Sequence, residues 1–158
     1  MDKLTKEQRS WNMSRIKSKD TLPEMLVRHA LWHMGYRYRL YYKKLPGKPD
    51  IVMPKYKTVI FVHGCFWHRH ENCKEASRPK SNSEYWENKI GRNVERDKKN
   101  IDMLEQLGWK VIVIWECQID KNVDNAISFL KKILIENNIL SSKLKNGTMP
   151  YDILESRA

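Results

Sequence analysis

The sequence predicts a single α/β domain in which a mixed β-sheet is flanked by helices. Three short runs rich in β-branched and other apolar residues are typical of buried strands, and they span residues 51–53, 58–63 and 109–115. Longer stretches with apolar residues at helical spacing precede the first run, separate the second from the third and follow the third. With 158 residues and no internal repeat, the chain is long enough for one core.

The chain begins with a polar, basic segment, residues 1–19, whose helical pattern is weak, and we expect it to form an arm outside the core. A capping-box pattern at residues 21–24, followed later by Gly35 as a stop, predicts a helix over residues 22–34. Residues 36–42 alternate aromatic and basic side chains, which predicts an edge or half-exposed strand.

The runs at residues 51–53 and 58–63 are separated by a short turn, and we expect them to pair as a hairpin. In an antiparallel pair, Asp50 at the start of the first strand lies across from the far end of the second. The sequence therefore predicts that Asp50 is close to Val62 and His63.

The second half of the chain has a further capping-box pattern, at residues 81–84. It opens a helical region in which we expect Gly91 to mark a bend or a break. The apolar run at 109–115 is continuous, which predicts a central strand covered on both faces. A last helix is predicted over about residues 122–137.

The formal net charge is +11, from 30 Lys and Arg against 19 Asp and Glu. This excess is expected of a protein whose partner carries phosphates, although solubility alone is an alternative explanation. No apolar run approaches the ~18 residues needed to span a bilayer, and the N-terminus lacks an apolar signal segment. Three cysteines cannot all pair, which favours a reducing compartment, and we expect a cytoplasmic protein with no membrane partner.

Three thiols and one imidazole form a candidate metal site, and such a set suits a closed, tetrahedral structural zinc. The residues are Cys65, His70, Cys73 and Cys117. Since Cys117 follows a different strand from the others, zinc would tie two strand ends together. The spacing is not that of a zinc finger, and inert thiols are the alternative.

Two adjacent aromatic residues, Phe66 and Trp67, lie in the same short polar loop and cannot both be buried easily. An aromatic wedge inserted between base pairs is one way in which proteins kink a duplex. We expect at least one of the two to face DNA, with Trp86 and Met13 as weaker candidates. The alternative is that one of them fills the core.

A lone Asp after Pro-Gly-Lys-Pro could simply cap a turn. Asp50, however, is expected opposite a strand end, with Glu24 on the first long helix, and hard oxygen ligands are what magnesium requires. Magnesium held by a carboxylate and by phosphate oxygens can activate water and stabilise a leaving oxygen. His63 and His68 could supply a base or a positive partner near neutral pH.

Four segments together resemble the very short patch repair endonucleases, which nick DNA at T:G mismatches. They read LPGKPDIV, VIFVHGCFWHRH, YWENKIGRNVERD and GWKVIVIWEC, and the likeness runs from about residue 10 to residue 117. It implies a fold similar to that of the type II restriction endonucleases. It also implies Mg²⁺-dependent nicking of double-stranded DNA just 5′ of the mispaired T, at mismatches of the kind left by deamination of 5-methylcytosine.

By this resemblance Asp50 corresponds to the family's metal-binding carboxylate, and Val62 lies where a backbone carbonyl supplies a second ligand. The family usually has Thr at that position. His68 matches the catalytic histidine, and Asp97 matches the carboxylate that supports it. The accessory active-site positions match His63 and Glu24.

The resemblance also assigns Zn²⁺ to the four residues named above, although one extra residue separates His70 from Cys73. His70, rather than His68, is then the expected imidazole ligand. The aromatic wedge of the family matches Phe66, Trp67 and Trp86, and Met13 matches a residue that enters from the other groove.

We therefore expect a basic, DNA-contacting arm at residues 1–19, a nuclease domain at 20–140 and a tail at 141–158. The expected enzyme is a monomer with mismatch-repair factors as candidate partners. Two alternatives remain: a zinc-organised DNA-binding protein without catalysis, and a restriction-like nuclease that cuts matched duplex.

Overall fold

The computed structural model describes residues 4–119 and 123–137, so the expected C-terminal tail lies outside the described residues. Its helices and strands are, in chain order, α1 (Lys6–Ser14), α2 (Leu22–His33), β1 (Ile51–Met53), β2 (Thr58–His63), α3 (Ser83–Gln106), β3 (Lys110–Trp115) and α4 (Val123–Glu136). Three single 3₁₀ turns complete the described elements: η1 (Pro54–Tyr56) directly after β1, η2 (Lys74–Ala76) within the loop between β2 and α3, and η3 (Glu116–Gln118) directly after β3. No helix of this described part has the length and apolar character needed to cross a membrane.

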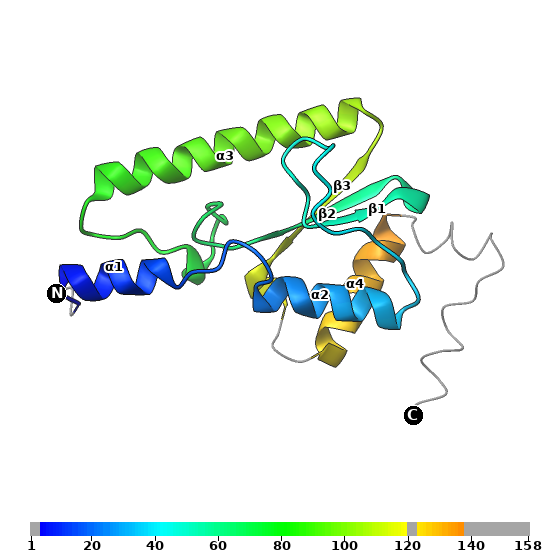
Figure 1. Cartoon of the computed structure of the whole chain (residues 1–158), viewed down its shortest axis with the longest axis horizontal. Coiled ribbons are helices and arrows are strands. Elements are labelled where there is room, and N and C mark those ends of the chain that lie inside the picture. Colours follow the sequence, from blue (N-terminus) through cyan, green and yellow to red (C-terminus); the bar gives the residue numbers. More distant parts are fainter. Residues whose placement is uncertain (1–3, 120–122, 138–158) are drawn as a thin grey trace.

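The sheet has the order β1-β2-β3, with β1 antiparallel and β3 parallel to β2. Helices α2 and α4 lie side by side on one face of the sheet, and the long helix α3 runs along the other (Figure 1). Strand residues alternate between the two faces, so that Ile60 packs with α2 and α4 while Val59 and Phe61 pack with Leu104 of α3. The predicted α/β class with a mixed, helix-flanked sheet is therefore confirmed.

The hairpin forms in the expected register, with Ile51 opposite Ile60. Asp50 consequently reaches the far end of β2, where the backbone N–H of Val62 donates to its Oδ2 at 2.8 Å. The parallel pairing places His63 opposite Trp115, so β2 and β3 end at the same edge of the sheet. The loop after β2 and the turn after β3 therefore leave the sheet side by side.

Two strand predictions were wrong. Residues 36–42 form only an isolated bridge between Arg39 and Val52, because Tyr41 adopts φ +54°, which an extended strand does not allow. Strand β3 is an edge of the described sheet rather than its centre, and its residues are buried mainly on alternate positions. The central strand is β2, of which five of the six residues are buried.

The cap predictions also need correction. The Thr21 hydroxyl donates to Oε1 of Glu24 at 2.9 Å and does not cap the backbone of α2. Helix α3 begins at Ser83 after Asn82, which has φ +51° and makes no side-chain cap. Helix α3 is one unbroken element of 24 residues, and Gly91 faces open space without bending it, because a helix tolerates one glycine at a cost of about 1 kcal/mol.

Candidate active site and metal centre

The four zinc candidates come together where β2 and β3 end. Cys65 follows β2 by two residues, and Cys117 lies in the 3₁₀ turn directly after β3. The carboxylate of Glu116 fastens the two ends to each other, because its Oε1 accepts the backbone N–H of Cys65 at 3.0 Å. The loop then turns back on itself, and His70 N donates to the carbonyl oxygen of Cys65 at 3.0 Å.

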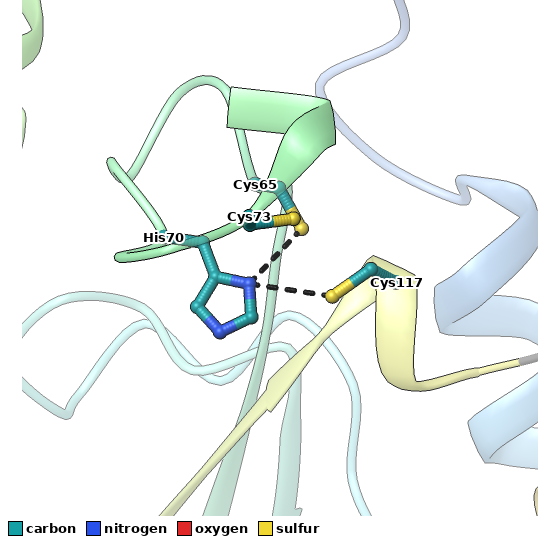
Figure 2. A group of neighbouring side chains, drawn as sticks. All are labelled: Cys65, His70, Cys73 and Cys117. Carbon is teal, nitrogen blue, oxygen red and sulfur yellow. Dashed lines mark hydrogen bonds between the residues drawn. The ribbon is translucent and has the colours of Figure 1, made fainter. Parts of the chain in front are cut away.

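His70 points its Nδ1 into this group, 3.5 Å from Sγ of Cys65 and 3.3 Å from Sγ of Cys117 (Figure 2). With Cys73, the four ligand atoms all lie within 4.8 Å of one another. Nitrogen and sulfur ligands of a tetrahedral zinc are separated by about 3.5 Å, given the usual metal–ligand distances. Burial raises the pKa of the Cys65 thiol to about 12, so a bound cation is what would keep it a thiolate. The arrangement fits a structural zinc ion.

A separate cavity of about 800 Å³ opens beside this cluster. Each active-site residue expected from the sequence lines it: Glu24, Asp50, Val62, His63, His68 and Asp97. They come from five parts of the chain, namely the start of α2, the residue before β1, the end of β2, the loop after it, and the middle of α3. The fold thus collects six side chains or backbone groups that are far apart in the sequence.

His68 is oriented by a hydrogen bond from its Nδ1 to Oδ2 of Asp97. Its ring also stacks on that of His63, with centroids 3.9 Å apart and the planes within 7° of parallel. The carboxylate occupies Nδ1, so Nε2 is the ring nitrogen of His68 that can exchange a proton with a molecule in the cavity.

Burial controls the charge of two groups in the cavity. It raises the pKa of Asp50 to about 6, and the nearby charge of Glu24 adds to the shift. It lowers the pKa of His63 to about 4, aided by the charge of His68. At neutral pH the cavity therefore holds a neutral His63 and an ionised Asp50. The positive neighbours of the Asp50 carboxylate do not offset the cost of burying its charge.

Trp115 connects the cluster to the cavity. Its ring stacks on His70 at 4.2 Å between centroids and meets His63 edge-on at 5.3 Å. Since His63 in turn stacks on His68, a continuous series of ring contacts runs from the metal candidates to the histidine that Asp97 orients.

The three wedge candidates Phe66, Trp67 and Trp86 pack edge to face, with centroids 5.2 to 5.9 Å apart, and none of them is buried. The ammonium group of Lys89 lies over the rings of Trp67 and Trp86, at 5.5 and 5.6 Å from their centroids. Trp67 lines the 800 Å³ cavity, whereas Phe66 and Trp86 line a second one of about 340 Å³. Met13 lies apart from them on α1, is 38% exposed, and lines neither of these two cavities.

Three residues of the site were missed by sequence reasoning. Glu116 fastens Cys65, Asn93 donates from Nδ2 to the backbone oxygen of Trp67 at 3.2 Å, and Arg28 is buried against Glu24. The signals were weak: Glu116 directly precedes Cys117, and Arg28 lies four residues after Glu24 on the same face of α2.

An α/β fold that gathers carboxylates and a carboxylate-supported histidine in one open cavity, on a strongly basic chain, is typical of a hydrolase that acts on a phosphate polymer. The family model described as DNA mismatch endonuclease Vsr matches residues 1–75. The chain is 52% identical over 118 residues to Type II nicking enzyme V.NmeAIP of Neisseria meningitidis serogroup A. This match covers 75% of this chain and 84% of the relative. It is 42% identical over 130 residues to DNA mismatch endonuclease Vsr of Escherichia coli K12, covering 80% and 81%.

A further relative, Type II nicking enzyme V.XorIIP of Xanthomonas oryzae, is 47% identical over 118 residues, covering 75% of this chain and 86% of the relative. The chain therefore belongs to the Vsr family of DNA mismatch endonucleases. It is a hydrolase whose substrate is DNA.

Proposed function

We propose that the protein is a Mg²⁺-dependent endonuclease that nicks one strand of double-stranded DNA 5′ of the mispaired T in a T:G mismatch. The observation that carries this proposal is the single cavity lined by every residue of the expected active site. The proposed fold is accordingly that of a restriction endonuclease, with the active carboxylate at the start of β1 and a mixed sheet between helices.

Asp50 and the backbone carbonyl of Val62 are the proposed magnesium ligands. Asp50 directly precedes β1, Val62 lies on the neighbouring strand β2, and the two are already joined by the hydrogen bond from Val62 N to Oδ2 of Asp50. The raised pKa of Asp50 fits this role, because a buried carboxylate with too few positive neighbours is the kind of group that a divalent cation stabilises. When bound, magnesium would supply Lewis-acid stabilisation of negative charge at the scissile phosphate.

His68 is the proposed general base. Its Nε2 accepts a proton from the attacking water, and Asp97 stabilises the imidazolium that results. His63 stays neutral, so it packs against the ring of His68 without adding a competing positive charge. Glu24 lies at the N-terminal end of α2 and lines the same cavity as an accessory group.

The proposed Zn²⁺ site, formed by Cys65, His70, Cys73 and Cys117, has a supporting role. The loop between Cys65 and Cys73 carries both His68 and the aromatic residues, so a closed metal site would fix the direction of both. This explains why a structural ion would lie next to an active cavity.

Mismatch selectivity is proposed to come from the deformability of the DNA. A T:G wobble pair is easier to distort than a matched pair, and a wedge made of Phe66, Trp67 and Trp86 would exploit the difference. Met13 would enter from the other groove, on a basic arm at residues 1–19 whose helix α1 has no buried residue. In this proposal residues 20–140 form the nuclease domain of a cytoplasmic monomer, and mismatch-repair factors are candidate partners.

The test uses end-labelled duplexes that differ at one pair: T:G, C:G and T:A. With magnesium, we expect one nick 5′ of the mispaired T in the T:G duplex, no cleavage of the other two, and no nick in EDTA. Binding without any nick would favour the zinc-organised DNA-binding protein. Cleavage of both strands of the matched duplexes would favour a restriction-like enzyme.

A further inference from the structure

Arg28 is a buried cation next to the cavity, and its side chain is only 8% exposed. A guanidinium is seldom buried without partners, because its removal from water is costly. Here it contacts two carboxylates: Nη2 is 3.1 Å from Oε2 of Glu24, and Nη1 is 2.5 Å from Oδ1 of Asp20. Arg28 therefore joins a cavity-lining residue to the segment that precedes α2.

The carboxylate of Glu24 is held at both oxygens. Oε1 accepts from the hydroxyl of Thr21 at 2.9 Å, and Oε2 accepts from the backbone N–H of Asp20 at 3.0 Å as well as from Arg28. The side chain of Glu24 is only 6% exposed. These donors restrict it to one rotamer, and they set where its carboxylate faces the cavity.

Tyr41 adds a third segment to this arrangement, since its hydroxyl donates to Oδ1 of Asp20. Asp20 and Tyr41 both have φ +54°, a left-handed conformation that aspartate tolerates but that is unfavourable for a bulky residue such as tyrosine. Such strain persists where surrounding contacts overdetermine it, and it is common at functional sites. Asp20, Arg28 and Tyr41 thus form a clasp between the N-terminal segment, α2 and the segment before β1.

We propose that Arg28, together with Asp20 and Tyr41, positions Glu24 for DNA cleavage and couples it to the wall of the cavity formed by residues 16–21. Ile16, Lys17, Ser18 and Thr21 line the cavity, and Asp20 in the same segment supplies both a backbone donor to Glu24 and a carboxylate to Arg28. When this wall contacts DNA, its position is transmitted to the Glu24 carboxylate. The inference rests on the proposed function, which assigns Glu24 to the active site.

The charge balance supports this role. The single guanidinium of Arg28 faces two carboxylates directly, those of Asp20 and Glu24. The guanidinium and the two carboxylates together keep a negative net charge. Arg28 can therefore fix the geometry of Glu24 without removing the negative charge that a divalent cation in the cavity would need.

The test compares full-length variants in nicking of the T:G duplex, with kcat, KM for DNA and the half-saturating magnesium concentration as readouts. Arg28→Met should lower kcat by about ten- to a hundredfold and raise the half-saturating magnesium concentration, as loss of a partner that orients a ligand generally does. KM for DNA should stay within about twofold, and Arg28→Lys should restore part of kcat.

Two phenylalanine variants give a matched pair. Tyr41→Phe removes the hydroxyl that holds Asp20 and should lower kcat measurably. Tyr38→Phe removes a hydroxyl that donates to the backbone oxygen of Arg28 at 3.1 Å, outside the clasp, and should leave kcat unchanged. Equal kcat in the two variants would overturn the inference even if Arg28→Met did not fold.

A double variant separates positioning from general stability. If Arg28 acts through Glu24, Arg28→Met should cost little further kcat in a Glu24→Gln background, whereas independent roles give additive losses. If Glu24→Gln loses most of its kcat while the Arg28 and Tyr41 variants keep theirs, the positioning role is overturned, but the assignment of Glu24 to the active site stands. Full activity of Glu24→Gln would instead contradict the assignment of Glu24 to the active site, and with it this inference.

Discussion

The Cys/His cluster and the cavity lie at the same edge of the sheet, yet they are built in opposite ways. In the cluster, donor atoms from the segments that follow two strands converge to within 4.8 Å of one another, close enough to hold one metal ion. In the cavity, the expected active-site residues come from five parts of the chain and surround about 800 Å³ of space. The difference shows that one sheet edge can carry two kinds of site: donors that converge suit a bound ion that braces the fold, and donors arranged around a volume suit a substrate.

The two regions are joined by Trp115, which contacts His70 on one side and His63 on the other. A change in the cluster should therefore disturb the cavity. The reverse should not hold, because a cavity residue can be replaced without moving the thiols. The five predictions below test this comparison between the cluster and the cavity, beginning with the one that should have the greatest effect.

Asp50→Asn should abolish nicking and leave the cluster intact. We expect a loss in kcat on the order of a thousandfold, the size of effect seen when a preorganised electrostatic group is removed. DNA binding and the zinc content should be unchanged. Nicking of the T:G duplex and elemental analysis measure the two outcomes, and undiminished cleavage would remove the proposed metal ligand.

The same variant should be more stable than the parent when metal is absent. The folded-state pKa of Asp50 is raised to about 6 from 3.8, so its contribution to stability is full below pH ~4 and is lost as the pH rises through about 6. Asparagine cannot ionise, so Asp50→Asn should raise the free energy of unfolding at pH 7 by on the order of 2 kcal/mol. Urea unfolding in EDTA at pH 4 and pH 7 would show this, and an equal difference at both pH values would contradict it.

His68→Ala should lower kcat by about a hundredfold or more, the usual contribution of a general base. Asp97→Asn should cost less, about ten- to a hundredfold, since it only orients the ring. His33→Ala is the control, because His33 is an exposed histidine at the end of α2. If the three variants nick T:G duplex at the same rate, His68 has no part in proton transfer.

Cys117→Ser tests whether the cluster holds an ion. Cys117 is exposed, so without a metal its replacement should change the stability by less than about 0.5 kcal/mol. As a zinc ligand it should contribute far more, and the variant should lose both zinc and several kcal/mol of stability, together with nicking activity through Trp115. Unfolding in a strong chelator is the control, because there the difference between variant and parent should vanish.

Trp86→Ala should produce the smallest effect, on binding rather than on the chemical step. Loss of one stacking ring should weaken binding to the T:G duplex by about 1–3 kcal/mol and reduce its preference over C:G duplex. Trp32→Ala is a matched control, because Trp32 is 55% exposed on α2 and stacks with Arg37 instead of the wedge residues. Equal affinities of the two variants at fixed salt would exclude Trp86 from the DNA interface.

Local sequence patterns were sufficient to predict the hairpin. The pairing of residues 51–53 with 58–63 follows from period and turn length, and the position of Asp50 beside Val62 follows from the register. The segment at 36–42 could not be predicted in the same way. Its alternation suits a strand, but Tyr41 adopts a left-handed conformation and its hydroxyl donates to Asp20, a tertiary contact 21 residues away in the sequence.

The candidate site also combines features that the sequence could predict with features that it could not. His68 and His70 are two residues apart, and their spacing does not say which ring turns toward the thiols. The backbone decides it, since His68 N bonds the carbonyl of Gly64 and His70 N bonds that of Cys65, so that the rings end in different environments. The partner of His68, Asp97, is 29 residues away on α3, and only the family resemblance pointed to it. Arg28 was missed because an arginine on a helix is normally expected in solvent.

Gly47 has φ +72°, and a methyl group there would come within 2.9 Å of Cβ of Asn100 on α3. Both residues line the cavity, and the loop that contains Gly47 leads directly to Asp50. The loop can therefore lie this close to α3 because glycine has a hydrogen atom where every other amino acid has Cβ. The spacing between the carboxylate proposed to hold magnesium and the helix that carries Asp97 is in this way set by the smallest side chain of the protein.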